Sequence, residues 1–182
     1  MKENKNNFYA NGQIKRVQYH VGDKLHREDG PAEIEYYQDG AVEFEAYCIN
    51  DERHRDDGPA VIWYYENGNI KIKVYYKNNE PHKEDGPVRT YYYENGQIEY
   101  EEYYMDGKAH RESLPAQIDY HKNGTIKREL YSINGNLHRE CGPAYIEYDL
   151  NGKIWHEQYY INNERITDEF QILVIQGLGM KK

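Results

Sequence analysis

The sequence predicts an all-β protein, an elongated antiparallel sheet built from about six tandem 28-residue hairpin repeats. Three observations lead to this fold class. A 28-residue period runs through almost all of the 182 residues. Within each period, two runs rich in Tyr and β-branched residues are separated by Asn-Gly or Asp-Gly, a strong hairpin signal. No sustained 3.6-residue apolar period runs through the repeats, which argues against helices there.

The period is visible in columns of identical or similar residues. One column is all glycine, preceded each time by Asn or Asp and followed two residues later by Ile or Val. Further columns hold Tyr, His and Pro at constant spacing. The glycine column consists of Gly12, Gly40, Gly68, Gly96, Gly124 and Gly152. Such self-similarity indicates a repeat architecture in which each unit packs on its neighbours.

The fourth copy illustrates the elements within one unit. Thr90–Tyr93 is a β-prone run, and Asn95-Gly96 supplies two residues that tolerate positive φ. We therefore predict a two-residue type I′ turn there. The segment 98–104 is the return strand, and Asp106-Gly107 marks a second tight turn before the next copy.

Two architectures are compatible with this unit. Successive strands pair antiparallel in a hairpin array, whereas a β-solenoid stacks equivalent strands in parallel. The Asn-Gly turns favour the hairpin array. We expect one repeat domain over residues 1–166, followed by a cap or interaction tail at 167–182. The expected repeat units are 4–31, 32–59, 60–87, 88–115, 116–143 and 144–166.

The two ends depart from the repeat. Residues 1–7 are polar and retain little of the consensus, so we expect them to be mobile. The tail contains the most apolar run of the chain, Phe170–Ile175. It is predicted to close the last exposed sheet edge, as a strand or a short helix. The alternative is a dimerisation segment that makes the protein a homodimer.

Composition restricts the function. The net charge is −9, and 21 of the residues are Tyr. An acidic surface attracts a basic partner and repels nucleic acid and anionic membrane. No apolar stretch is long enough to span a bilayer, and the two cysteines, Cys48 and Cys141, cannot form a disulfide framework. We expect a soluble cytoplasmic protein without cofactor or bound metal.

The His-x-x-Asp pattern is the most evident candidate for chemistry, because His and carboxylate side chains bind metals and transfer protons. Equivalent residues of adjacent copies lie two strands apart, roughly 10 Å, too far to share one zinc ion. The Asp column also changes to Ser113 and Cys141. We therefore interpret the pattern as turn structure, with Asp accepting from backbone N–H and His bonding a carbonyl or Tyr hydroxyl. These structural residues are His26, Asp29, His54, Asp57, His82, Asp85, His110 and His138.

A column of tyrosines that is lost toward the C-terminus is the candidate binding surface. A packing need shared by all copies would not stop after four, so the loss indicates a partner contact, and cross-strand aromatic stacking on an exposed sheet face is the equal alternative. Tyr is a frequent interface residue, and carboxylates surround the column. The predicted partner-binding residues are Tyr9, Tyr37, Tyr65, Tyr93, Glu35, Glu66 and Glu94.

The segments Tyr-Tyr-Glu-Asn-Gly-Gln-Ile (92–98) and Tyr-Tyr-Glu-Asn-Gly-Asn-Ile (64–70) resemble the MORN-type repeats of bacterial YwqK-like proteins, a family often described as antitoxins. The resemblance implies successive hairpins with a binding rather than a catalytic role. This chain departs from it by a longer link, His-Arg-Glu-Asp-Gly-Pro-Ala at 26–32, so neither the family's partner nor its site residues carry over.

The sequence therefore predicts a non-catalytic protein–protein interaction module. An antitoxin-like or defence-inhibitor protein would occlude a basic partner with the Tyr/Glu-rich sheet face. The alternative is a carbohydrate-binding repeat protein, because aromatic rows also stack on sugar rings. A metal-dependent hydrolase built on His and Asp is a third hypothesis.

Overall fold

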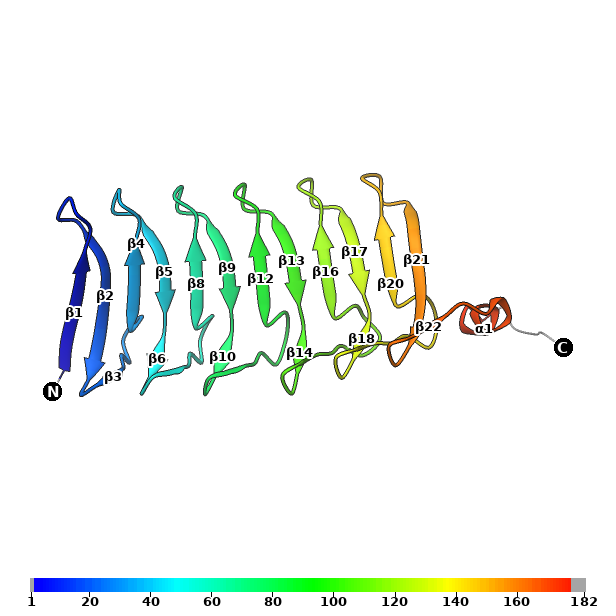
Figure 1. The fold of residues 1–182 in the computed structure, drawn as a ribbon, viewed down its shortest axis with the longest axis horizontal. Coiled ribbons are helices and arrows are strands. Elements are labelled where there is room, and N and C mark those ends of the chain that lie inside the picture. The colour runs from blue at the N-terminus through cyan, green and yellow to red at the C-terminus, as the bar shows by residue number, and fades with distance from the viewer. Residues whose placement is uncertain (1, 178–182) are drawn as a thin grey trace. The chain divides into compact units, whose positions relative to one another are not determined.

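The computed structural model describes residues 2–177. The chain divides into two compact units, Met1–Gln97 and Ile98–Lys182. Each unit consists of antiparallel hairpins that follow one another in chain order, and the second also carries a short helix near its end (Figure 1).

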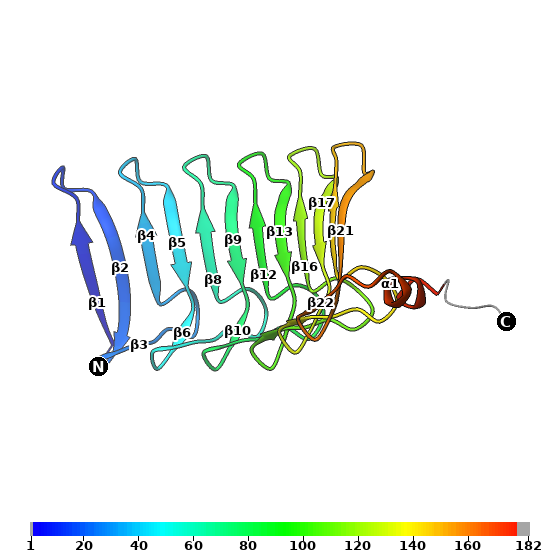
Figure 2. The ribbon, with the colours of Figure 1, turned by 45° about the vertical axis from the view of Figure 1, so that its right-hand side comes forward.

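In the first unit, seven strands pair in the order β1-β2-β4-β5-β8-β9-β12. Short strands lie at the end of the hairpins away from the Asn-Gly turns, and both views show this arrangement (Figures 1 and 2). The main strands are β1 (Lys2–Phe8), β2 (Ile14–Val21), β4 (Glu33–Tyr36), β5 (Val42–Ala46), β8 (Val61–Tyr64), β9 (Ile70–Val74) and β12 (Arg89–Tyr92). The short strands are β3 (Lys24–Leu25), β6 (Cys48–Ile49), β7 (Glu52–Arg53), β10 (Tyr76–Lys77) and β11 (Glu80–Pro81).

The second unit repeats the plan with strands in the order β13-β16-β17-β20-β21-β22. Two short hairpins, β14–β15 and β18–β19, again follow the main ones. The main strands are β13 (Ile98–Glu102), β16 (Gln117–Tyr120), β17 (Ile126–Leu130), β20 (Tyr145–Tyr148), β21 (Ile154–Ile161) and β22 (Glu164–Ile166). The short strands are β14 (Tyr104–Met105), β15 (Lys108–Ala109), β18 (Ser132–Ile133) and β19 (Asn136–Leu137).

The predicted all-β fold of tandem antiparallel hairpins is confirmed. Every strand pair within the units runs antiparallel, both inside a hairpin, as in β4–β5, and between copies, as in β5–β8. A solenoid would instead stack equivalent strands in parallel. The hairpin signal at each Asn-Gly therefore identified the architecture correctly.

The prediction of the turn type at Asn95-Gly96 is wrong. Only the glycine has a positive φ, 84°, whereas a type I′ turn needs two such residues. The N–H of Gly96 donates to Tyr93 O (2.8 Å), and the N–H of Tyr93 donates to Gln97 O (2.8 Å). This is a three-residue loop, a type I turn closed by a left-handed glycine. The strands that flank the equivalent loops of the β16–β17 and β20–β21 hairpins show a register shift, as such a loop predicts.

The tight two-residue turns lie at the other end of the strands. In the β6–β7 hairpin, Asn50 and Asp51 have φ values of 54° and 72°. The same pair of positive φ angles recurs at Asn78-Asn79, Asp106-Gly107, Asn134-Gly135 and Asn162-Asn163. Asn and Asp occupy this region more easily than other non-glycine residues, so these are the type I′ turns.

Small apolar residues form the junction between copies. The residue after the repeated loop proline of each copy is almost completely buried, and four of these five residues are alanine: Ala32, Ala60, Val88, Ala116 and Ala144. In the first unit a larger cluster adds Phe44, Val61 and Val74, with Trp63 packed against it. The Phe44 and Trp63 rings lie 4.4 Å apart. The core therefore consists of thin layers of small apolar side chains rather than one thick aliphatic interior.

The ends differ from expectation in two respects: the N-terminal segment is a strand, and the last sheet edge is paired by a strand that precedes the apolar run. The polar residues expected to be mobile form β1, which pairs with β2 along its whole length. The last edge is partly closed by β22, which pairs with Tyr159–Ile161 of β21. The apolar run forms the helix α1 (Glu169–Ile175), whose first turn is capped by Asp168 accepting from Gln171 N–H. Formation of a homodimer, in which two protein molecules contact one another through this tail, stays a prediction.

Candidate functional site

The loops that follow the short hairpins hold the His-x-x-Asp residues. The His ring contacts the turn of the next copy: His54 Nδ1 lies 2.9 Å from Asn78 Oδ1, and the main-chain N–H of Asn78 donates to the same nitrogen (3.3 Å). Equivalent contacts join His26 with Asn50, His110 with Asn134 and His138 with Asn162. The ring partner is an asparagine rather than the carbonyl or tyrosine hydroxyl that the sequence predicted.

The Asp residues of the first two copies also have a different partner from the one expected. Arg27 Nε donates to Asp29 Oδ1, and Arg55 Nε donates to Asp57 Oδ1, each at 2.8 Å. This hydrogen bond is the main reason why the pKa of Asp57 lies below its ordinary value. The carboxylates therefore hold the neighbouring guanidinium in place, and turn stabilisation through backbone N–H is secondary.

A column of basic residues was missed by the sequence analysis. Each loop places an Arg or Lys over the ring of the Tyr eight residues earlier, with Arg55 3.9 Å from the Tyr47 ring centre. Such cation–π contacts stabilise by about 0.5–2 kcal/mol each. The pairs are Arg27 with Tyr19, Arg55 with Tyr47, Lys83 with Tyr75, Arg111 with Tyr103 and Arg139 with Tyr131. Both columns are visible in the sequence, at constant separation.

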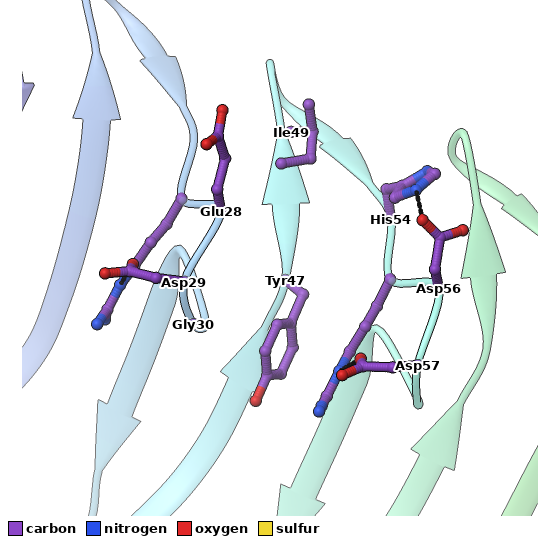
Figure 3. Close-up of a pocket in the computed structure, with 10 residues that line it drawn as sticks. Glu28, Asp29, Gly30, Tyr47, Ile49, His54, Asp56 and Asp57 are labelled. Carbon is purple, nitrogen blue, oxygen red and sulfur yellow. Dashed lines mark hydrogen bonds and ion pairs between the residues drawn. The ribbon is translucent and has the colours of Figure 1, made fainter.

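Hollows lie between successive loops. The one drawn in Figure 3 has a volume of about 560 Å³ and contains Tyr47 and Ile49 between two charged loops. His54 Nε2 lies 3.4 Å from Asp56 Oδ2 at its side. His82 and Asp85 line the next hollow, with Arg55 on the opposite loop. In each unit, the predicted structural residues thus lie in the loops that follow the short hairpins.

The tyrosine column connects consecutive copies. The hydroxyl of Tyr37 donates to Tyr64 O at 2.6 Å, and Tyr9 and Tyr65 make the same bond to Tyr36 O and Tyr92 O. All three side chains are half-buried. These tyrosines thus have a structural role that the sequence analysis did not assign, and their partner-binding role stays a prediction.

The loss of this column toward the C-terminus has a structural explanation. His121 replaces Tyr in the fifth copy, and its Nε2 lies 3.4 Å from Tyr148 O, a longer version of the same contact. Asp149 replaces it in the last copy, where no further copy follows to accept a bond. Asp149 Oδ1 instead accepts from the N–H groups of Asn151 and Lys153. The loss therefore does not by itself indicate a partner.

The predicted carboxylates do not share one location. Glu35 lies in β4 and is paired with Arg16 of β2. Glu66 and Glu94 lie in hairpin turns and are exposed. Glu66 is close enough to Tyr37 to contribute to raising the pKa of that phenol, after burial and Glu43. The structure thus brings Tyr37 and Glu66 together and places Glu35 apart from them.

A family model described as "MORN repeat variant" matches three segments, residues 60–78, 88–106 and 144–162. Each match begins at or just after the loop proline and ends in the second turn, so it spans one main hairpin. These three matches support a repeat family of the MORN type. A search of curated proteins found no match.

MORN repeats are commonly protein- or membrane-binding modules, and the family is generally non-enzymatic. Within residues 2–177, no helix combines the length and apolar composition needed to cross a bilayer. Over the same described part of the chain, no three His, Cys, Asp or Glu residues converge on a position that suits a metal ion.

Comparison of the repeat copies identifies two further residues, both large, apolar and exposed. Leu150 and Trp155, 63% and 66% exposed, lie in the last hairpin. At the position of Trp155 the other copies have Lys15, Glu43, Lys71, Glu99 and Lys127, and at that of Leu150 none has a large apolar residue. The repeat fold therefore does not need either side chain, and comparing the columns is the signal that finds them.

The two thiols of the chain are expected to react differently. Cys48 is buried, and burial raises its pKa to about 11, whereas Cys141 is exposed. The reactive form is the thiolate, so at pH 8 the Cys48 thiol stays protonated and shielded. A thiol-reactive dye should label about one site per native chain and two after unfolding in guanidinium. Labelling of Cys48 in the native protein at a rate similar to Cys141 would contradict this environment.

Proposed function

We propose that this chain is a non-catalytic protein-binding module whose partner presents a basic surface. The MORN-type repeats and the net charge of −9 support this function. An antitoxin-like or defence-inhibitor role, in which the protein occludes its partner, is the form suggested by the resemblance to YwqK-like proteins.

The surface around Tyr37 is the observation that carries the proposal. Burial raises the pKa of this phenol, and Glu43, Glu66 and Asp39 raise it further through their negative charge. In the first and third copies a lysine occupies the position of Glu43, and Lys15 and Lys71 lie over the rings of Tyr9 and Tyr65. Tyr37 has a carboxylate there instead, so a Lys or Arg from a partner can take the equivalent position.

The same contacts weaken the carbohydrate alternative. Aromatic residues that bind sugars present their ring faces to the sugar. Here the lysine ammonium groups are 5.6 Å from the Tyr9 ring centre and 5.5 Å from that of Tyr65. The row is therefore interrupted by the protein's own cations, which favours recognition of charge over stacking along a glycan.

Charge reversal at the Tyr37 surface should weaken binding. The test variant combines Glu43→Lys and Glu66→Lys, residues that other copies carry in the same columns, as Lys71 and Lys122. Retention of a partner from lysate of the source cells, measured by quantitative mass spectrometry, should fall at least about tenfold, because close interfacial charge pairs contribute about 1.5 kcal/mol or more.

The matched control is Glu52→Lys with Glu80→Lys. It makes the same change in net charge within the same unit, at exposed positions of the short strands β7 and β11 at the opposite end of the hairpins. Lys24 and Lys108 occupy that column in other copies. A protein retained by the wild type and the control but lost from the test variant supports the proposal. Equal retention by all three, or retention of glycans without a stoichiometric protein, would overturn it.

A further inference from the structure

The basic loop residues of the fourth and fifth copies lack the carboxylate that their counterparts have. Arg27 and Arg55 each donate through Nε to an Asp two residues later. At the corresponding positions after Arg111 and Arg139 stand Ser113 and Cys141. The Nε–H groups of these two arginines therefore lose the carboxylate acceptor that the first two copies provide.

The two guanidinium groups nevertheless stay in the same position. Arg111 lies 3.9 Å from the Tyr103 ring centre, and Arg139 lies 3.7 Å from that of Tyr131. Their Nη1 atoms donate to Pro115 O (3.4 Å) and Pro143 O (3.1 Å), as Arg27 and Arg55 do to the prolines of their own loops. Stacking and the proline contact thus orient each arginine without the Asp.

Both arginines line one hollow of about 590 Å³, with Tyr131 and Ile133 on its wall. Its charge differs from that of the equivalent hollow in the first unit. There, two arginines face four carboxylates, Glu28, Asp29, Asp56 and Asp57. Here, two arginines face only two, Glu112 and Glu140, both of which are exposed.

We propose that this hollow binds oxyanions, with Arg111 and Arg139 as the ligand-binding residues. Guanidinium groups bind carboxylate and phosphate through paired N–H donors, and an added anion would take the position that Asp29 and Asp57 occupy in the other copies. The two arginines are one copy apart, roughly 10 Å at about 4.8 Å per strand. A ligand with two anionic groups at that separation engages both.

The acidity of the whole chain does not oppose this site. At physiological ionic strength the interactions of exposed charges are screened over about 8 Å, so the groups lining the hollow dominate its potential. This site is separate from the acidic Tyr37 surface, which lies in the first unit, and neither depends on the other.

The test observes the arginine Nε–H signals directly by ¹⁵N NMR. Inorganic phosphate and suberate, a linear dicarboxylate, are titrated separately into the full chain, with acetate as the single-charge comparison for suberate. The signals of Arg111 and Arg139 should shift and saturate, whereas those of Arg27 and Arg55, which are already paired, should not. Tighter binding of suberate than of acetate indicates that both arginines hold one ligand.

Two variants exchange, between repeat copies, the residue that stands two positions after the loop arginine. Cys141→Asp introduces the residue present in the first three copies and should remove the response of Arg139 while Arg111 still responds. Asp57→Ser should create a new response at Arg55. Circular dichroism establishes that both variants are folded. Equal shifts of all four arginines, or no saturable shift at millimolar anion, would overturn the proposal.

Discussion

Phe44→Ala is expected to lower the free energy of unfolding of the first unit by about 3–5 kcal/mol, the cost of removing a buried aromatic side chain. Phe44 is 6% exposed and its ring lies against that of Trp63. The two residues are cross-strand partners in β5 and β8. Because the sheet has only thin layers of apolar contacts, neighbouring side chains have little freedom to fill the resulting cavity. Urea denaturation followed by Trp fluorescence measures the loss.

Arg16→Ala is the matched control, because Arg16 occupies the same column one copy earlier. There the cross-strand partner is Glu35, and the pair is an ion pair with 39% of the Arg side chain exposed. Such partly solvated pairs contribute about 0–1 kcal/mol. Equal losses for the two variants would contradict the assignment of the first unit's core to Phe44 and its neighbours.

Ala60→Asp is expected to destabilise the same unit by several kcal/mol, because it places an unpaired carboxylate in a fully buried position. Ala60 is 0% exposed, and its carbonyl accepts from the N–H of Tyr47 in the preceding strand connection (2.8 Å). Ala60→Val should cost far less, since Val88 occupies the equivalent position and is equally buried.

The destabilisation by Asp should depend on pH. Burial raises the pKa of the introduced carboxyl above its value in the unfolded chain, so the folded state takes up a proton more readily. The loss of stability relative to wild type is then largest at pH 8 and shrinks as pH falls through the raised pKa. Thermal unfolding at pH 8 and pH 5 measures both effects. A pH-independent loss would show that the new side chain reaches solvent.

The turns illustrate how far sequence reasoning extends. Asn-Gly or Asp-Gly marked each main hairpin correctly, but the type I′ turns occur at the second turn, where Asn50-Asp51 and Asn78-Asn79 have no glycine at all. Contacts from the preceding copy stabilise these strained residues: the N–H of Leu25 donates to Asp51 Oδ1, and His54 contacts Asn78. The turn propensity of the local sequence does not predict these contacts, because the bonded residues are 24–26 positions apart in the sequence.

At the candidate site, too, the sequence identifies the repeated residues but not their bonding partners. The columns of Tyr, His, Asp and Arg are evident in the sequence, and the spacing of a repeat suffices to identify them as one set. Their partners were not evident. Asp29 bonds Arg27 rather than backbone, and Tyr37 bonds the next copy rather than facing solvent alone. Residue spacing gives the column but not the direction in which a side chain points.

The 28-residue period by itself determined the architecture, because identical units with a hairpin signal can bury their apolar residues only against one another. It also determined where each turn lies. Only the tertiary structure decided which residues bond across copies and how the chain ends. The polar segment Lys2–Phe8 is a strand because β2 offers an unpaired edge, and Asp149 needs no tyrosine hydroxyl because no copy follows it. Both depend on what lies beside a residue in space, and adjacent strands are far apart in the chain.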